Sequence, residues 1–195
     1  MLIVFLILIL GLLTPRLAGR LAVPVEKMGK WIFYGAIVAI FSVQWYSAWQ
    51  QYSLWKYGGP PASYLLPPYQ PISYFYLYAY MQFFNKFVIS CFAAFLILIA
   101  AKILNYYFKK RFFEDEEPYF SALSVFLLGQ PLWLFYAPAI LGSAVLASVY
   151  NQYFRKKRGR LSLYYLWTPA GIFLLLLVMA LKAYGAPANL LFWLL

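Results

Sequence analysis

Histidine is absent from this 195-residue sequence, and cysteine occurs once, at Cys91. The lack of histidine removes the commonest general base and the commonest transition-metal ligand. A single cysteine allows no disulfide within the chain and no cysteine-based metal site. Nucleophilic catalysis by a serine–histidine or cysteine–histidine pair is therefore excluded in its usual form, and we expect no metal and no cofactor.

Charged residues are also few. They form 11% of the sequence, against about a quarter in soluble domains, while 65% of the residues are hydrophobic and 23% are aromatic. This composition predicts an integral membrane protein, and the length predicts one bundle. The net charge is +11, but the basic residues gather at the ends of apolar runs. Basic residues gather in this way when they set the orientation of a protein in a membrane. We therefore expect membrane lipids as partners and no nucleic acid.

The chain divides into three regions within one helical membrane domain. The first has two apolar runs, the second a Pro- and Tyr-rich exterior loop followed by an interfacial segment, and the third the remaining spans with charged cytoplasmic loops. Their bounds are 1–49, 50–85 and 86–195. The exterior loop is expected over 50–71. After it, tyrosines alternate with other residues as in a strand, but an isolated strand in a bilayer leaves its backbone unpaired, so we predict a helix.

The segment Tyr119–Tyr150 is too long for one membrane crossing, which takes about 20 residues. Gly129, Gln130 and Pro131 interrupt it, because proline breaks a helix. Basic clusters flank the segment on both sides, which favours the same membrane face for its two ends. We therefore predict a helical hairpin that turns at these three residues. The fold class is all-α: a polytopic α-helical membrane protein with about five to six membrane segments, including this hairpin.

Lys and Arg set the expected orientation, since they prefer cytoplasmic loops. The N-terminus and the loop 50–71 are predicted outside, and 14–30, 105–118 and 151–160 inside. The residues that determine this orientation are Arg16, Arg20, Lys109, Lys110, Arg111, Arg155, Lys156, Lys157, Arg158 and Arg160.

Four of the five acidic residues form one tetrad, Glu114–Glu117. Pro118 suits the first turn of a helix, and carboxylates before a helix are favoured by its dipole, so we predict a helix start near Tyr119. A tetrad in this position is most simply a solvated turn, exposed to water and balanced by the neighbouring basic residues. The candidate catalytic acids are Asp115, Glu116, Glu117 and Glu26.

The segment from Glu114 to Gly129 resembles part of the type IV prepilin peptidases, which are aspartic intramembrane proteases. In that family an acidic residue at the cytoplasmic face opens an apolar helix that ends in Leu-Gly. The small-residue helix 137–150, the basic loop 155–160 and the Pro- and Gly-containing start of the last helix, 168–171, are also similar. The resemblance covers the chain from about residue 110 onward. It implies a prokaryotic cytoplasmic membrane and pilin-like peptides as partners.

The departures from that family concern its chemistry. Two aspartates share the catalytic work there, and such a pair needs close carboxylates with pKa values pushed apart. This chain has one aspartate, Asp115, and lacks the family's catalytic glycines and its paired cysteine motifs. We therefore expect a non-catalytic scaffold or assembly subunit that contacts other membrane subunits. Two alternatives remain open: an active peptidase in which Asp115 and Glu26 form the acid pair, and a carrier of lipid or another small substrate.

Overall fold

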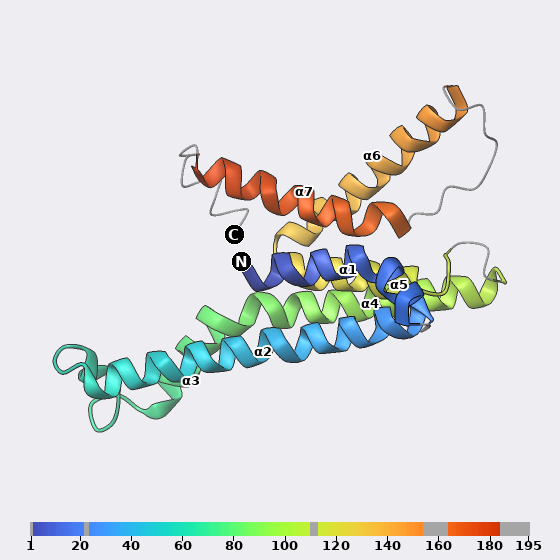
Figure 1. Ribbon diagram of the computed structural model, residues 1–195. Helices are drawn as coiled ribbons and strands as arrows, with labels where there is room; N and C mark the ends of the chain where they lie inside the picture. Colours follow the sequence, from blue (N-terminus) through green and yellow to red (C-terminus); the bar gives the residue numbers. More distant parts are fainter. Residues whose placement is uncertain (1, 22–23, 110–112, 154–163, 184–195) are drawn as a thin grey trace.

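The computed structural model describes residues 2–21, 24–109, 113–153 and 164–183, and within them all regular structure is helical. This confirms the all-α prediction. The helices are α1 (Leu2–Leu21), α2 (Val25–Tyr57), α3 (Ile72–Ala79), α4 (Asn85–Tyr107), α5 (Glu117–Leu128), α6 (Leu132–Tyr153) and α7 (Tyr164–Ala183), with a 3₁₀ turn at Ala62–Leu65 and a π-helical turn at Tyr80–Phe84 (Figure 1).

Two of the described helical stretches are long and apolar enough to cross a membrane. They are Val25–Tyr57 and the continuous stretch Ile72–Tyr107, in which the π-helical turn joins α3 to α4. The apolar parts of α5, α6 and α7 are shorter. The structure thus contains two helices of spanning length, and the expected total of five to six membrane segments stays a prediction.

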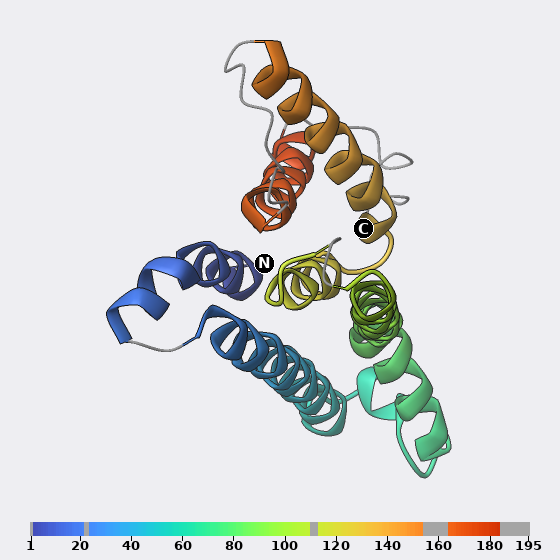
Figure 2. The ribbon, with the colours of Figure 1, turned by 90° about the vertical axis from the view of Figure 1, so that its right-hand side faces the viewer.

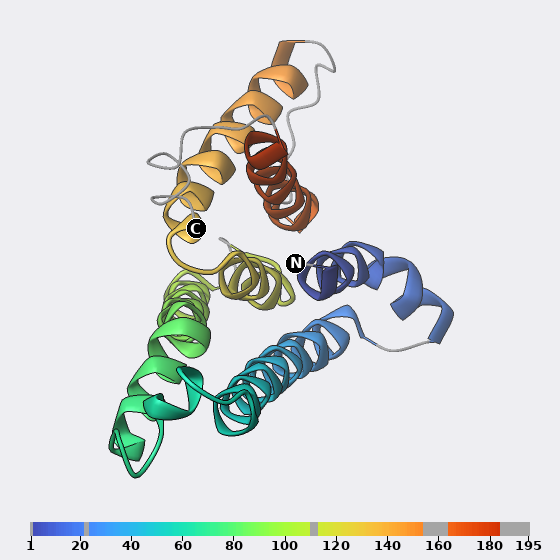
Figure 3. The same ribbon diagram turned by 90° about the vertical axis from the view of Figure 1, so that its left-hand side faces the viewer.

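Helix α5 is the centre of the bundle. All of its twelve residues are buried, and α1, α2, α4, α6 and α7 all contact it. Figures 2 and 3 show it end-on, with the other helices arranged around it. A helix that is mostly apolar around its circumference suits this position, because no face of it meets water. The largest fully buried side chains of α5 are Phe120 and Phe126.

Three glycines, from three different helices, allow close approach to α5. A Cβ atom added at Gly29 of α2 would lie 3.1 Å from Cε2 of Phe120. The equivalent atoms at Gly11 of α1 and Gly171 of α7 would lie 3.5 Å from Leu123 and 3.7 Å from Ser124. Small residues at such contacts let helix backbones pack closely, which is a common means of association in membranes.

The turn between α5 and α6 consists of Gly129, Gln130 and Pro131. Gly129 has a φ of +73°, which glycine adopts without the steric cost that a side chain brings. After the turn, α6 runs back toward the end of the molecule at which α5 begins (Figure 1). The break therefore lies at the three residues that the sequence indicated.

The Pro-rich loop begins later than expected. We predicted it over 50–71, but α2 continues to Tyr57, so that the bound at residue 50 was wrong. The first helix breaker after Trp49 is Gly58, and packing stabilises the added turns. Trp55 is buried, with its ring centroid 4.8 Å from that of Tyr78. The tyrosine-rich segment after the loop is helical, as predicted.

Two of the predicted cytoplasmic segments, 14–30 and 105–118, meet at one end of the molecule, whereas the end of α6, where the third begins, lies apart from them (Figure 1). The C-terminal end of α1, the start of α2, the end of α4 and the start of α5 lie together there, and the Pro-rich loop lies at the opposite end (Figure 1). Arg20 is in the last turn of α1, and Lys109 follows α4. Several predicted orientation residues lie outside the described part of the chain: Lys110, Arg111, Arg155, Lys156, Lys157, Arg158 and Arg160.

Candidate functional site

The acidic tetrad is divided between solvent and core. Glu114 and Asp115 are exposed and Glu116 is half-buried, but Glu117 is only 2% exposed. The expectation that the whole tetrad is solvated is therefore wrong for Glu117. Its burial follows from its position as the first residue of α5, since that helix is enclosed along its entire length.

A tight turn holds the buried carboxylate. The backbone N–H of Glu114 donates to Oε2 of Glu117 at 3.3 Å, and the backbone N–H of Glu117 donates to the carbonyl oxygen of Glu114 at 3.2 Å. The carboxylate also lies at a helix N-terminus, where the dipole favours negative charge. Hydrogen bonds of this kind reduce the cost of burying an acid, which is high when the group has no partner.

Two side chains of α4 hold the start of α5 and the residue Phe113 before it. The side chain of Asn105 bonds both backbone groups of Phe113: its Nδ2 donates to the carbonyl oxygen, and its Oδ1 accepts from the amide, each at 2.9 Å. One turn earlier, Nζ of Lys102 donates to the hydroxyl of Tyr119 at 2.8 Å and lies 4.7 Å from the centroid of that ring. These contacts position the first turn of α5 against α4.

The structure does not enclose two carboxylates together. All five acidic residues belong to the described part of the chain, and Glu117 alone among them is buried. Glu26 lies in the first turn of α2 and is exposed, although nearby Gly29 packs against Tyr119 and Phe120. The described residues also contain no group of three or more His, Cys, Asp or Glu that could hold a metal ion.

The pKa of Glu116 lies above its usual value. Partial burial raises the pKa of its carboxyl above the usual value, its own backbone hydrogen bond opposes this, and the negative charges of Glu114, Asp115 and Glu117 raise the pKa further. Successive helical residues point about 100° apart, which does not favour two adjacent acids at a helix start as a pair around one water.

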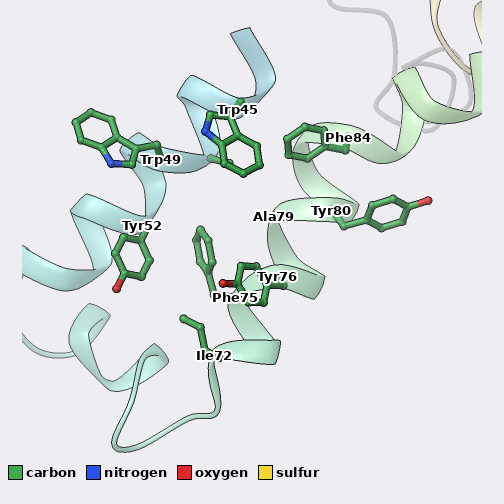
Figure 4. A pocket seen from close by; sticks show the side chains of 10 residues that line it. Trp45, Trp49, Tyr52, Ile72, Phe75, Tyr76, Ala79, Tyr80 and Phe84 are labelled. Atoms are coloured by element: carbon green, nitrogen blue, oxygen red, sulfur yellow. The ribbon is translucent and has the colours of Figure 1, made fainter. Parts of the chain in front are cut away.

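A separate hollow lies at the far end of α2, beside α3. We call it the aromatic groove; its volume is about 450 Å³ (Figure 4). Most of the side chains that line it are aromatic, and none of them is charged. They are Trp45, Ala48, Trp49, Tyr52, Ile72, Phe75, Tyr76, Ala79, Tyr80 and Phe84.

Ring contacts fix the walls of the aromatic groove. The ring of Phe75 lies between those of Tyr52 and Trp55, with centroid distances of 5.2 and 5.5 Å. At the other end, the ring of Phe84 stacks on Phe41 at 6.3 Å and meets the edge of Trp45 at 6.5 Å. Phe84 belongs to the π-helical turn, a feature that is frequent at functional sites.

Sequence reasoning missed the aromatic groove, although a signal was present. We assigned the residues after Trp49 to an exterior loop, and one lining residue, Tyr52, lies in the part of that range that is helical. The lining residues recur at intervals of three and four on both helices: 45, 48, 49 and 52 on α2, and 72, 75, 76, 79 and 80 from α3 onward. That spacing places each set on one helical face.

In comparisons with known proteins, no protein-family model, no curated protein and no solved structure matches the chain.

Proposed function

We propose that this protein is a non-catalytic, multi-pass membrane protein that serves as a scaffold or assembly subunit and descends from a prepilin-peptidase-like fold. Its partners on this proposal are membrane lipids together with other membrane subunits or pilin-like peptides. The composition, the two helices of spanning length and the gathering of charged helix ends at one end of the bundle support a membrane location.

The observation that carries the non-catalytic role is the separation of the acids. An aspartic protease needs two carboxylates around one water, with a like-charged neighbour that raises one of the pKa values. Here Glu117 is enclosed, whereas Asp115 and Glu26 are exposed. Glu116 has a raised pKa but is only half-buried, and it precedes the enclosed helix α5.

The path of the chain supports the proposed ancestry. An acid opens α5, the helix ends in Leu128-Gly129, and α6 follows after a short turn. This is the order of features that the resemblance to the prepilin peptidases implies. On this proposal, Glu117 at the start of α5 would be a remnant of the acid that opens this helix in that family, without a second acid enclosed beside it.

A cleavage assay tests the non-catalytic role. We expect the purified chain in lipid vesicles to leave a pilin-like peptide uncut, under conditions in which an active prepilin peptidase cuts it. Asp115→Asn is expected to behave like the parent chain in this assay, and to leave cellular function nearly intact, because Asp115 is exposed. Cleavage that Asp115→Asn or Glu117→Gln abolishes, while Glu114→Gln does not, would establish the peptidase alternative.

Cysteine labelling tests the orientation. In a Cys91→Ala background, we expect Gln70→Cys in the Pro-rich loop to react with a membrane-impermeant maleimide in intact cells. Gly19→Cys, near the C-terminal end of α1, should react only after the membrane is permeabilised. Both positions are exposed, so accessibility within the fold does not limit the reaction. Labelling of both from the same side would contradict the predicted topology.

A further inference from the structure

We propose that the aromatic groove binds one hydrocarbon chain of a membrane phospholipid. The inference rests on the membrane location in the proposed function and is independent of the non-catalytic role. It follows from the depth of the aromatic groove along two helices, from the chemistry of its lining and from its shape.

Helix α2 places the aromatic groove at the edge of the hydrocarbon layer. Lys27 and Lys30 stand at the start of α2, and Trp31 follows them as an interfacial residue. The hydrocarbon core is about 30 Å thick, or about 20 helical residues for a helix near the membrane normal. Counted from Trp31, the far boundary falls near Gln50, within the stretch 45–52 that lines the aromatic groove.

The second wall gives the same depth independently. Lys102 lies toward the charged end of the continuous helix 72–107. About 20 residues back from Lys102, the far boundary falls near Gln82, in the π-helical turn. Phe84 therefore lies just inside the boundary, the lining residues 76–80 lie about 3–9 Å beyond it in the interfacial layer, and Ile72 lies about 15 Å beyond it. A phospholipid whose hydrocarbon chain lies in the aromatic groove has its ester groups at the level of the Trp and Tyr side chains.

The lining suits an alkyl chain. Aromatic faces and the methyl groups of Ala48 and Ala79 offer dispersion contacts, and no lining residue is charged. The polar atoms of the lining are the hydroxyls of tyrosine and the indole N–H groups of tryptophan, side chains that have an apolar body and one polar end. Such residues are enriched where hydrocarbon meets the lipid headgroups.

The shape favours an extended chain over a partner helix. The wall over 72–84 is about 20 Å long at 1.5 Å per residue. A helix about 10 Å in diameter is much wider than an extended alkyl chain, and the volume of the aromatic groove, about 450 Å³, is in the range of small-ligand pockets. The ring contacts of Phe75 and Phe84 hold the walls in place, so the site is largely preformed, as small-molecule sites usually are.

Photo-cross-linking tests this site. The full chain is reconstituted in vesicles of phosphatidylethanolamine and phosphatidylglycerol with a trace of phospholipid that carries a diazirine in its acyl chain, and the adducts are mapped by mass spectrometry. We expect adducts on the aromatic groove at least about fivefold above those on Phe92 and Leu96, a ratio equivalent to about 1 kcal/mol. Both reference residues are exposed on α4.

Matched variants separate the site from general lipid contact. Ala79→Phe fills the floor of the aromatic groove and is expected to remove the preference, while Ala100→Phe, at an exposed position of the same continuous helix, is expected to keep it. Tyr76→Ala removes a rim side chain that is mostly exposed, so it should fold normally and also reduce the preference. This second variant keeps the test decisive if Ala79→Phe does not fold.

Three results would overturn the inference. Equal labelling of the aromatic groove and of Phe92 would show ordinary lipid contact. Labelling of Phe92 with protection of the aromatic groove, in the parent chain and in Tyr76→Ala alike, would show that another occupant, such as an apolar segment of a partner, covers it. An absence of adducts on every helix would overturn the membrane location itself, and the lipid site with it.

Discussion

Replacement of Gly29 by leucine is expected to destabilise the bundle by about 3 kcal/mol, because it forces extra atoms into a packed interface. A Cβ at this position would already lie 3.1 and 3.2 Å from two ring carbons of Phe120. That ring is 1% exposed, and it belongs to a helix that is enclosed on all sides, so it has little room to move. The leucine side chain would therefore push α2 away from α5.

The measurement is unfolding in a titration with sodium dodecyl sulfate, followed by tryptophan fluorescence. Gly35→Leu is the matched control, since Gly35 lies on the same helix and has no atom within 4 Å of a built Cβ. Leucine is the better helix former by about 0.5–1 kcal/mol, so the control should be as stable as the parent chain or slightly more stable. An equal loss of stability in Gly29→Leu and Gly35→Leu would contradict the close approach of α2 to α5.

Truncation of Phe126 to alanine is expected to cost about 3–5 kcal/mol, the range for large aromatic side chains in a packed core. Phe126 is fully buried, and the rings of Phe41 and Phe87 each lie 6.3 Å from it between centroids. The loss leaves a cavity at the centre of the bundle, which neither water nor lipid can easily fill. For a chain of this size we expect the midpoint of thermal unfolding to fall by about 10 °C.

Phe92→Ala is the control for this prediction. Phe92 lies on α4 and is 67% exposed, so its removal creates no internal cavity and should change stability by about 0.5 kcal/mol or less. Thermal unfolding of both variants in the same lipid discs compares them directly. Similar midpoints for Phe126→Ala and Phe92→Ala would contradict the central position of α5.

The comparison of Phe92 with Phe126 also explains which parts of the fold the sequence predicts. Helix formation and the break at Gly129 follow from local chemistry, because a bilayer requires internal hydrogen bonds and glycine and proline interrupt helices. The central position of α5 does not follow. In the proposed membrane location both lipid and core are apolar, so the hydrophobic pattern does not distinguish a lipid-facing phenylalanine from a buried one.

The same reasoning applies to the candidate sites. The tetrad marked the start of α5, but the burial of Glu117 depends on five other helices, which no local pattern encodes. The aromatic groove depends on the contact between the end of α2 and α3, two segments separated by the Pro-rich loop. The length of α2 was predictable in principle, because Gly58 is the first residue after Trp49 that ends a helix.

The enclosure of α5 has a consequence for biosynthesis. Its neighbours come from both sides of it in the chain: α1, α2 and α4 precede it, whereas α6 and α7 follow it. Ser124 of α5 donates a hydrogen bond to the carbonyl oxygen of Trp167 in α7 at 3.4 Å, and Tyr136 of α6 donates to the same oxygen at 2.6 Å. During synthesis α5 therefore emerges before two of its five neighbours exist. A nascent chain that stops short of α7 exposes a hydroxyl-bearing face of its innermost helix, a feature by which cellular quality control can distinguish an unfinished chain from a finished one.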